Sequence, residues 1–406
     1  MVVYVINQDG KPLMPCKPAK AKHLLRDQKA KVVRRTPFTI KLLWECEAKL
    51  QEVTAGMDTG SKMIGCAAVA NGHVVYQAEV TLRQDISKKM ERRKAYRRTR
   101  RQRKTRYRKA RWQNRASSRR EGRLAPSVKS KVASHLREKQ FVESILPVSR
   151  WVVETASFDI HKISNPEVHG PEYQNGQQKG FYNVKAFVLH RDGHQCQKCK
   201  TKKGKLHVHH LVFRSQGGSD EPNNLLTLCV ECHEELHRGE FTLKGRKAKT
   251  KHATEMGFIK AQIQRQFGEF TETFGYETKF QREQVLHWPK THYADAVAIC
   301  CTEGETVIPL DVIYLKRHVA KGDYQQTKGK HSEKKIPTGK LFGLRKFDLV
   351  KTPKGIYFVK GKRSTGRFAL ADIGGNIVHR SVDVKKRCLR IKARSTTLVQ
   401  PLFLKP

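Results

Sequence analysis

The chain is short of acidic residues. Its 406 residues include 37 Asp and Glu against 82 Lys and Arg, so the formal net charge is +45 at pH 7 and the pI is near 10.1. This excess is far larger than solubility needs, and it indicates a polyanionic partner, either nucleic acid or an anionic membrane. The length allows roughly two to four domains.

Long apolar runs are also lacking. Hydrophobic residues make up 38% of the chain, and no run approaches the roughly 20 residues that a membrane-spanning helix needs. The first residues, MVVYVINQDGKPL, lack the charged segment followed by an apolar segment that marks a secretory signal. We therefore expect a cytoplasmic protein that has nucleic acid rather than a membrane as its partner.

Cysteine is sparse outside one motif. Four of the ten cysteines form two Cys-x-x-Cys pairs, Cys196 with Cys199 and Cys229 with Cys232, and the other six are scattered in mostly apolar contexts. This usage indicates reduced thiols and metal ligation rather than disulfides. The spacing of the pairs is typical of a tetrahedral zinc site. Four protein ligands leave no open position, so we expect a structural zinc that ties a hairpin to a helix.

The residues between and beside these pairs have no role at that zinc. HVHHL is expected as a strand, FRSQGGSDEPNN as a loop, LLTLC as a second strand, and CHEELH as the start of a helix. His209 and His210 are adjacent, so on a strand their side chains point to opposite faces. This order and lettering resemble the HNH (ββα-metal) nuclease family over about forty residues. The alternative is a plain zinc ribbon with surface histidines.

The HNH resemblance implies specific roles for these residues. His210 is the general base that activates water, while His209 and His233 hold a Mg²⁺ ion at the scissile phosphate. Asn224 orients the strand of His210 through backbone hydrogen bonds. The assignment of base and ligand between His209 and His210 stays open. The His-His pair stands where many HNH enzymes have Asp-His, so a neutral ligand replaces an anionic one. His207 and His237 are expected to be peripheral.

Three carboxylates far apart in sequence are similarly placed. Asp58 ends the first strand of a β-meander that turns at Asn71-Gly72, Glu154 ends a buried strand, and Asp295 opens a helix. If they converge, they can hold two Mg²⁺ ions that clamp the attacking and leaving oxygens of a phosphodiester. Asp159, a few residues further on, is the alternative to Glu154 as the second carboxylate of this set.

The order of these carboxylates resembles the RuvC branch of the RNase H fold. His292 lies one turn before Asp295 on the same helix face, where it either ligates a metal, moves a proton or caps the helix.

A segment dominated by arginine and lysine spans residues 87–115 and has too few apolar residues for a core-facing stripe. Its residues favour a helix, but their like charges repel, so a helix there needs phosphates around it. The alternatives are a disordered basic tail and a helix that bridges two nucleic-acid strands. The second is favoured because Tyr96, Tyr107 and Trp112 are interleaved. The candidate phosphate-binding residues are Arg92, Arg93, Arg97, Arg100, Arg101, Arg103, Arg106, Arg108 and Arg111.

Runs along nearly the whole chain resemble the IscB family of transposon-encoded, RNA-guided HNH/RuvC DNA endonucleases, related to the ancestors of CRISPR type II effectors. The runs are KPLMPC, KAKVVRRTPFTI, GMDTG, the arginine-rich segment, YQNGQQKGFYNVKAFVLHRDGHQCQKC, HYADAVAIC and GKLFGLRKFDLV. The resemblance implies a monomeric bacterial or archaeal protein, nucleoid-associated when on DNA, that binds a long structured guide RNA and a double-stranded DNA target. HNH would cut the guide-paired strand and RuvC the displaced strand.

The expected fold is a multidomain α+β and α/β protein with an RNase H-like (RuvC) core split in sequence. The expected parts are an N-terminal PLMP domain at 1–52, RuvC segment I at 53–85, a bridge helix at 86–125, RuvC segment II at 126–165, a linker at 166–182, a zinc-stabilised HNH module at 183–240, a linker at 241–255, RuvC segment III at 256–306, and a C-terminal β-rich domain at 307–406 that reads a target-adjacent motif.

Two other functions fit parts of the sequence. An RNA-independent HNH-type DNA endonuclease would cut a fixed sequence by itself, but it has no need for the arginine-rich segment. A non-catalytic RNA-binding scaffold would bind without Mg²⁺ and would not cut, but it has no need for two metal-nuclease residue sets. The absence of a large helical lobe between the arginine-rich segment and Glu154 implies that RNA supports much of the guide–target duplex.

Overall fold

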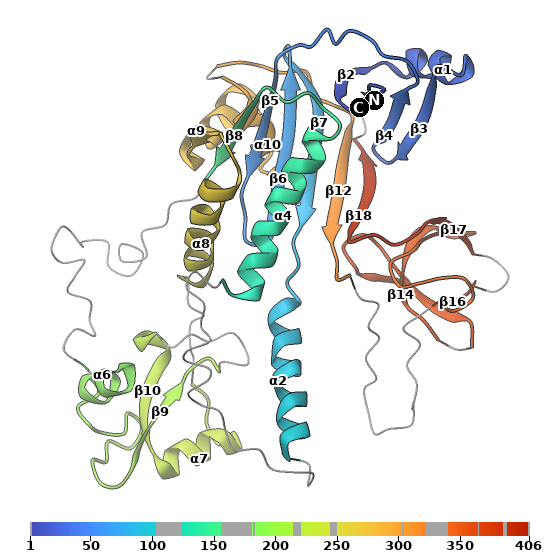
Figure 1. Ribbon diagram of the computed structural model, residues 1–406. Coiled ribbons are helices and arrows are strands. Elements are labelled where there is room, and N and C mark those ends of the chain that lie inside the picture. The colour runs from blue at the N-terminus through green and yellow to red at the C-terminus, as the bar shows by residue number, and fades with distance from the viewer. Residues whose placement is uncertain are drawn as a thin grey trace. The chain divides into compact units, whose positions relative to one another are not determined.

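The computed structural model describes residues 2–102, 124–155, 181, 183–213, 221–243, 250–302, 304–321, 340–363, 365–384 and 388–404, with the side chains of 98–102 and 250–254 excepted. The chain divides into two compact units. The first comprises Met1–Ala156 and Ile259–Pro406, and the second is Ser157–Phe258. Figure 1 shows the elements of both units.

The first unit begins with a small four-stranded sheet. Its strands β1 (Val3–Ile6), β2 (Pro12–Cys16), β3 (Ala30–Arg35) and β4 (Phe38–Leu42) lie in the order β2-β1-β4-β3. Helix α1 (Pro18–Arg26) follows β2 and has a proline in its first turn, where the missing N–H carries no cost. The buried Tyr4 hydroxyl donates to the carbonyl oxygen of Val75 at 2.9 Å, which ties this sheet to the next one.

A seven-stranded sheet is the centre of the first unit. Its order is β11-β8-β5-β6-β7-β12-β18, and the strands are β5 (Val53–Asp58), β6 (Met63–Ala70), β7 (His73–Thr81), β8 (Arg150–Glu154), β11 (Thr271–Thr273), β12 (Val312–His318) and β18 (Thr397–Phe403). Strands β5, β6 and β7 form an antiparallel meander, while β8 runs parallel to β5 and β11 parallel to β8. Asn71 and Gly72 both have positive φ in the β6–β7 turn, as a tight hairpin requires.

Helices α10 (His292–Cys300) and α4 (Pro126–Glu143) pack on opposite faces of this sheet. Gly65 of β6 faces α10 so closely that a Cβ there would lie 1.8 Å from the carbonyl oxygen of His292. Successive strand residues face opposite sides, and burial together with the nearby Glu138 carboxylate of α4 raises the pKa of the next residue, Cys66. The two helices therefore cover the sheet as two outer layers (Figure 1).

A buried polar contact holds α4 on the sheet. The Glu138 carboxylate accepts from the Lys316 ammonium and from the Tyr76 hydroxyl, each at 2.6 Å. The Lys316 ammonium also lies 3.5 Å from the centre of the Phe141 ring. Charges this deeply buried are stable only when they are paired, so these contacts fix the position of α4.

The rest of the first unit flanks the large sheet. Helix α2 is Ile86–Gln102, α9 is Gly275–Phe280, and η4 is a short π-helical stretch over Gln281–Val285. An antiparallel five-stranded sheet, in the order β16-β15-β14-β13-β17, closes on a small core that includes Val350, Val359 and Phe368. Its strands are β13 (Leu349–Thr352), β14 (Gly355–Gly361), β15 (Arg367–Ala371), β16 (Ile377–Asp383) and β17 (Leu389–Lys392).

The second unit is a β-hairpin with helices at its edges. Helix α6 (Val184–Arg191) precedes β9 (Leu206–His210), and the one-turn helix η3 (Pro222–Asn224) leads into β10 (Leu225–Cys229) and α7 (Val230–Arg238). Helix α8 (Thr250–Gln266) contains the boundary between the units. No helix in the described part of the chain is long and apolar enough to cross a membrane.

Candidate active sites

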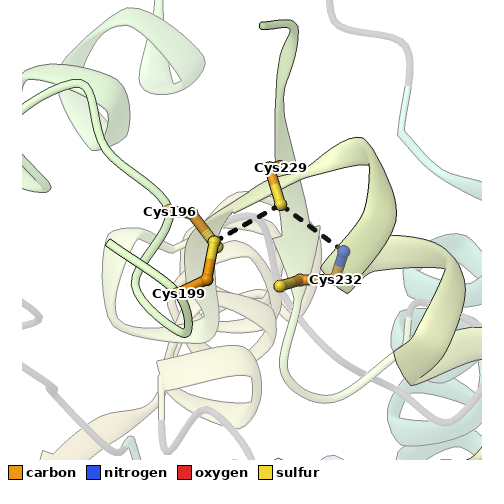
Figure 2. Close-up of side chains that lie close together, drawn as sticks. All are labelled: Cys196, Cys199, Cys229 and Cys232. Atoms are coloured by element: carbon orange, nitrogen blue, oxygen red, sulfur yellow. Dashed lines mark hydrogen bonds between the residues drawn. The ribbon is translucent and has the colours of Figure 1, made fainter. Parts of the chain in front are cut away.

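The four cysteines of the paired motif converge in the second unit. Their sulfur atoms all lie within 4.8 Å of one another, and Figure 2 shows them brought together from one turn and from the β10–α7 junction. The Sγ atoms of Cys199 and Cys229 are 3.7 Å apart, and the backbone N–H of Cys232 points at Sγ of Cys229 at 3.5 Å. Four cysteine sulfurs in this arrangement are the donor set that structural zinc takes.

The charge balance of this cysteine cluster also fits a cation. Burial opposes ionisation of Cys196, but backbone amides of Cys199, Cys229 and Lys198 lower the pKa of Cys196 to about 6. Burial and the neighbouring thiols raise the pKa of Cys232. A second buried thiolate therefore needs a positive charge between the sulfurs.

Three imidazoles form a second cluster in the same unit. Ligand atoms of His209, His233 and His237 all lie within 4.8 Å of one another. Burial, followed by the neighbouring His233 and His237, lowers the pKa of His209 to about 4, and burial and His237 lower the pKa of His233. Both rings are therefore neutral near pH 7, which is the form that ligates a divalent metal.

His210 lies outside this imidazole triad, as the alternation of β9 dictates. It lines a pocket of about 310 Å³ together with Lys185 and Lys205. The buried Asn224 holds Val212, which lies two residues after His210. Its side-chain amide donates to the carbonyl oxygen of Val212 at 3.0 Å and accepts from the Val212 N–H at 2.8 Å. A backbone bond from Leu211 N–H to Asn224 O at 2.8 Å completes the clamp. Asn224 thus fixes the end of the strand that carries His209 and His210.

The end of α6 holds the hairpin in place. Asp192 accepts from the Thr227 backbone N–H at 2.9 Å, and the Arg191 guanidinium donates to the carbonyl oxygens of Pro222 and Leu225 at 2.7 and 2.8 Å. These contacts position η3 and β10 relative to α6, and with them Asn224 and Cys229.

The large sheet of the first unit aligns the carboxylates predicted from the sequence. Asp58 pairs in register with Glu154 on one side and with Gly65 on the other, and Gly65 pairs with Glu79. Residues paired in this way share a face, and it is the face that α10 covers because Gly65 meets His292 there. The sheet register therefore brings Asp58 and Glu154 side by side, directly under the start of α10.

His292 binds this row directly. Its Nδ1 lies 2.6 Å from Oδ2 of Asp58, and its backbone N–H donates to Oε1 of Glu79 at 3.1 Å. The hydrogen bond with Asp58 raises the pKa of His292, while burial raises the pKa of Asp58 against the effect of His292. Both directions favour a proton held between the two groups, which a bound cation would displace.

Glu154 and Asp295 complete the group. Burial raises the pKa of Glu154, and the charges of Asp58 and Asp295 add to this effect. The Asp295 carboxylate forms an ion pair with Arg282, whose side chain is only 3% exposed. Among the described residues, the groups of three or more potential metal ligands within 4.8 Å of one another are the cysteine cluster and the imidazole triad. The carboxylates are therefore neighbours in a looser arrangement.

The arginine-rich segment is described in part. Arg92, Arg93 and Arg97 are exposed on α2, which has almost no apolar side for packing. Arg100 and Arg101 continue the helix, but the description does not extend to their side chains. Arg103, Arg106, Arg108 and Arg111 lie outside the described residues, as does Asp159.

Two contacts in these sites differ from the expectations or were missed. His237, expected to be peripheral, belongs to the imidazole triad, because its position four residues after His233 puts both side chains on one face of α7. That spacing was a usable signal. Arg282 had no comparable signal, since its contact with Asp295 depends on how η4 packs against α10.

Comparison with known proteins gives two family matches. The model described as RRXRR protein matches residues 3–176. The model described as HNH endonuclease matches residues 196–239, the stretch that holds the four cysteines, the imidazole triad, His210 and Asn224.

Curated relatives match shorter stretches. The chain is 38% identical over 56 residues to anaredoxin of Nostoc sp. (strain PCC 7120 / SAG 25.82 / UTEX 2576), which is 14% of this chain and 74% of that protein. It is 36% identical over 66 residues to the Type IV methyl-directed restriction enzyme EcoKMcrA of Escherichia coli (strain K12). This match covers 13% of the chain and spans only 22% of the length of that enzyme.

Proposed function

Because the chain belongs to the IscB-type proteins, with an RRXRR segment ahead of an HNH endonuclease domain, and is a metal-dependent DNA endonuclease, we propose that a guide RNA directs its cutting. The observation that carries this proposal is the coexistence of two distinct sets of nuclease residues with an exposed arginine-rich helix. The imidazole triad lies in the second unit, and the carboxylates lie on the central sheet of the first.

The HNH unit would cut the strand that pairs with the guide. His210 is the proposed general base, because its imidazole faces a pocket rather than the triad and Lys185 and Lys205 beside it can hold a phosphate. His209 and His233, joined by His237, are the proposed Mg²⁺ ligands. The cation would stabilise the charge that develops on the phosphate. Asn224 keeps His210 in position by clamping Val212.

The central sheet of the first unit would cut the displaced strand as a RuvC nuclease. Its meander followed by two parallel strands, in the order β11-β8-β5-β6-β7, is the arrangement that an RNase H-like core has. Asp58, Glu154 and Asp295 are the proposed ligands of two Mg²⁺ ions. His292, hydrogen-bonded to Asp58, would either join that ligand set or move a proton.

The remaining parts have supporting roles in this proposal. The cysteine cluster would hold structural zinc that orders the HNH unit, since four sulfurs converge there. Exposed arginines of α2 would contact the phosphates of the guide RNA or of its duplex with DNA. The five-stranded sheet belongs to the segment from 307 to 406 that we propose to read the target-adjacent motif. The active particle would be one protein chain with one RNA.

The decisive experiment is purification without nuclease treatment, followed by sequencing of the bound RNA. We expect a long RNA of defined sequence, and its variable end should direct cleavage of a matching DNA duplex. A preparation that is free of RNA and still cuts DNA would contradict RNA guidance.

Strand-specific labels then separate the two sites. We expect His210→Ala to leave only the cut in the displaced strand, and Asp58→Ala to leave only the cut in the paired strand. If either substitution removed both cuts, the assignment of one strand to each site would be wrong.

An RNA-independent HNH-type endonuclease is the second candidate, favoured by the identity with the restriction enzyme EcoKMcrA. It predicts that ribonuclease treatment leaves cleavage intact and that the cut falls at a fixed sequence or a modified base. The guide-directed mechanism predicts that the same treatment abolishes cleavage.

A further inference from the structure

Two aromatic side chains are exposed beside the carboxylates of the first unit. Phe274 is 42% exposed and Tyr276 is 71% exposed. Their rings are parallel, with planes 5° apart and centroids separated by 6.1 Å. Aromatic rings this exposed leave their faces open to a planar ligand. We call this pair the aromatic shelf.

The aromatic shelf is joined to the carboxylate centre through the backbone. Thr273 of β11 pairs in register with Glu154. Gly275 lies between the two aromatic residues, and a Cβ on it would lie only 3.1 Å from Oε1 of Glu154. The backbone between the two rings therefore touches the carboxylate, so a nucleotide whose phosphate reaches Glu154 has its base within reach of the aromatic shelf.

Glu277 fixes the aromatic shelf in place. Its carboxylate accepts from the Tyr276 hydroxyl at 3.0 Å, from the Phe274 backbone N–H at 3.1 Å and from the Thr273 hydroxyl at 2.6 Å. One side chain thus holds the residues on both sides of Gly275. An aromatic surface that is already fixed binds a flexible ligand more tightly than a mobile aromatic surface does, because the protein loses less conformational freedom on binding.

The charges around the aromatic shelf favour a nucleic-acid ligand. Lys290 acts on both Asp58 and Glu154 and favours their ionised forms, so it can also attract the phosphate of an incoming strand. Lys279, on α9, lies 3.9 Å from the Glu283 carboxylate, but its side chain is 68% exposed and so open to a ligand. Exposed aromatic rings among basic side chains are the arrangement by which proteins hold single strands without reading their sequence.

From this geometry we infer that Phe274 and Tyr276 stack on nucleobases of the single DNA strand whose phosphate enters the carboxylate centre. The inference rests on the proposed RuvC activity and deepens it by naming the residues that would hold the bases of its substrate strand. Every base has an aromatic face, so stacking accepts any sequence. That tolerance suits a site whose strand would change with every guide.

The test uses the full chain with its bound RNA and a single-stranded DNA that carries 2-aminopurine, a base whose fluorescence falls when it stacks. The Asp58→Asn background prevents cutting at the carboxylate centre. We expect quenching on binding, lost in the Phe274→Leu/Tyr276→Leu double variant with binding about tenfold weaker. Tyr276→Phe should keep the quenching. Phe280→Leu is the matched control, because Phe280 is 51% exposed on the same short helix but lies outside the stacked pair.

Cleavage kinetics give a second readout in the otherwise native chain. An abasic nucleotide at the displaced-strand cut site removes a base that can stack, so it should slow that cut about tenfold in the parent. The double variant already lacks the stacking rings, so it should cut the abasic and the normal strand at the same rate. The cut in the paired strand should not change. Equal quenching and equal displaced-strand rates in parent and double variant would overturn the inference. It would also be overturned if the double variant bound DNA normally but lost a protein that co-purifies with the parent, because the aromatic shelf would then be a protein-binding surface.

Failure of the stacking inference can be distinguished from failure of the RuvC proposal. If Asp58→Ala still cuts the displaced strand, the RuvC proposal fails. The fluorescence assay still tests stacking, because it needs neither cleavage nor pairing between guide and target. If Asp58→Ala abolishes that cut while the double variant cuts normally and still quenches 2-aminopurine, only the stacking inference fails.

Discussion

At the scale of single residues, the contact between Arg282 and Asp295 is the least expected feature of the carboxylate centre. The guanidinium is almost fully buried and pairs with both Asp295 and Glu283. Its Nε has no hydrogen-bond partner among the described residues. The cation therefore lies in a pocket that only partly satisfies it, beside a carboxylate that is a proposed ligand of Mg²⁺. Arg282 thus balances the negative charge of Asp295, which a bound metal ion would also balance.

This arrangement predicts that Arg282→Met makes stability depend on Mg²⁺. Removing one partner of a buried pair leaves the other charge uncompensated, which costs about 3–5 kcal/mol. Mg²⁺ bound at Asp295 should restore most of the lost stability, so the increase in Tm that Mg²⁺ causes should be larger in the variant than in the parent. Differential scanning calorimetry of both proteins with and without Mg²⁺ measures this increase in Tm.

Arg83→Met is the control for this prediction, because its pair with Asp85 is more exposed and should contribute no more than about 1 kcal/mol. Equal effects of Mg²⁺ on Arg282→Met and on the parent protein would show that the ion does not bind at Asp295.

At the scale of elements, the close approach of α10 to the central sheet places His292 and Asp295. Gly65 and Gly56 provide the space, because a Cβ at Gly56 would lie 2.4 Å from the carbonyl oxygen of Ala296. Both close contacts are to backbone atoms of the helix, which cannot rotate away as a side chain can. The two strand glycines thus set the height of α10 above Asp58.

Gly65→Ala is therefore expected to lift the start of α10 and to separate His292 from Asp58. We predict a lower Tm and loss of the displaced-strand cut, with the paired-strand cut retained at temperatures where the protein stays folded. The control is Gly257→Ala on α8, where a Cβ would lie within 4 Å of no atom in the described part of the chain. A Gly65→Ala protein that cut both strands at parent rates would rule out this role for the close contact.

Two buried histidines between α4 and β12 make the same unit sensitive to acid. Burial lowers the pKa of His135 to about 4 and the pKa of His318 to about 3, and neighbouring cations add to both shifts. The Nδ1 of His135 contacts the carbonyl oxygen of Lys131, and the Nδ1 of His318 contacts the Ser134 hydroxyl. Each Nε2 is buried and has no hydrogen-bond partner among the described residues. Protonation would bury an unpaired N–H and a charge, so both rings are neutral in the folded protein.

The unfolded state consequently binds more protons than the folded state below the ordinary histidine pKa of 6.5. The stabilisation is fully present above that pH and is lost as the pH falls toward the folded-state values. Between pH 6.5 and about pH 5 the loss is about 2 kcal/mol for each histidine. We predict that the free energy of unfolding, measured with denaturant, falls in this way with pH, and that His318→Gln makes the slope shallower by about half. An unchanged slope would mean that the pKa of His318 is the same in the folded and unfolded states.

At the scale of the whole molecule, much of the plan was predictable from local sequence signals. The spacing of Cys196, Cys199, Cys229 and Cys232 indicated a cluster that the structure contains, and the family matches confirm the IscB and HNH resemblances. The Asn71-Gly72 hairpin was also predictable, because both residues tolerate positive φ. Signals of this kind act within a few residues or at a fixed spacing.

The contacts that were not predictable join distant segments. Lys316 and Glu138 are 178 positions apart, and neither neighbourhood marks the other as its partner. The ion pair of Arg282 with Asp295 and the contact of Gly65 with His292 depend on sheet register and on helix packing. The roles of Asp58, Glu154, Asp295 and His292 remain predictions, now with a geometry that mutagenesis can test.

The two units differ in what stabilises them, and this gives the last prediction. The second unit has a small core cluster in which three of the four buried residues are Cys196, Cys229 and Cys232. A core this small is too little to fold the unit by itself, so we expect it to need a metal ion bound by these sulfurs. The large sheet of the first unit buries residues such as Met57, Ile64 and Tyr76, and among the described residues it has no such cysteine cluster.

Cys232→Ser should therefore release zinc and unfold the second unit alone. We expect about one zinc ion per parent chain by inductively coupled plasma mass spectrometry, falling to well below one in the variant. The variant should lose the paired-strand cut, gain protease-sensitive sites within 157–258, and keep the displaced-strand cut. Cys46→Ser, outside the cluster, should change none of these. The carboxylates belong to the first unit, so unfolding of the second unit alone should leave the displaced-strand cut intact. Loss of both cuts in Cys232→Ser would therefore mean that the two units do not act independently.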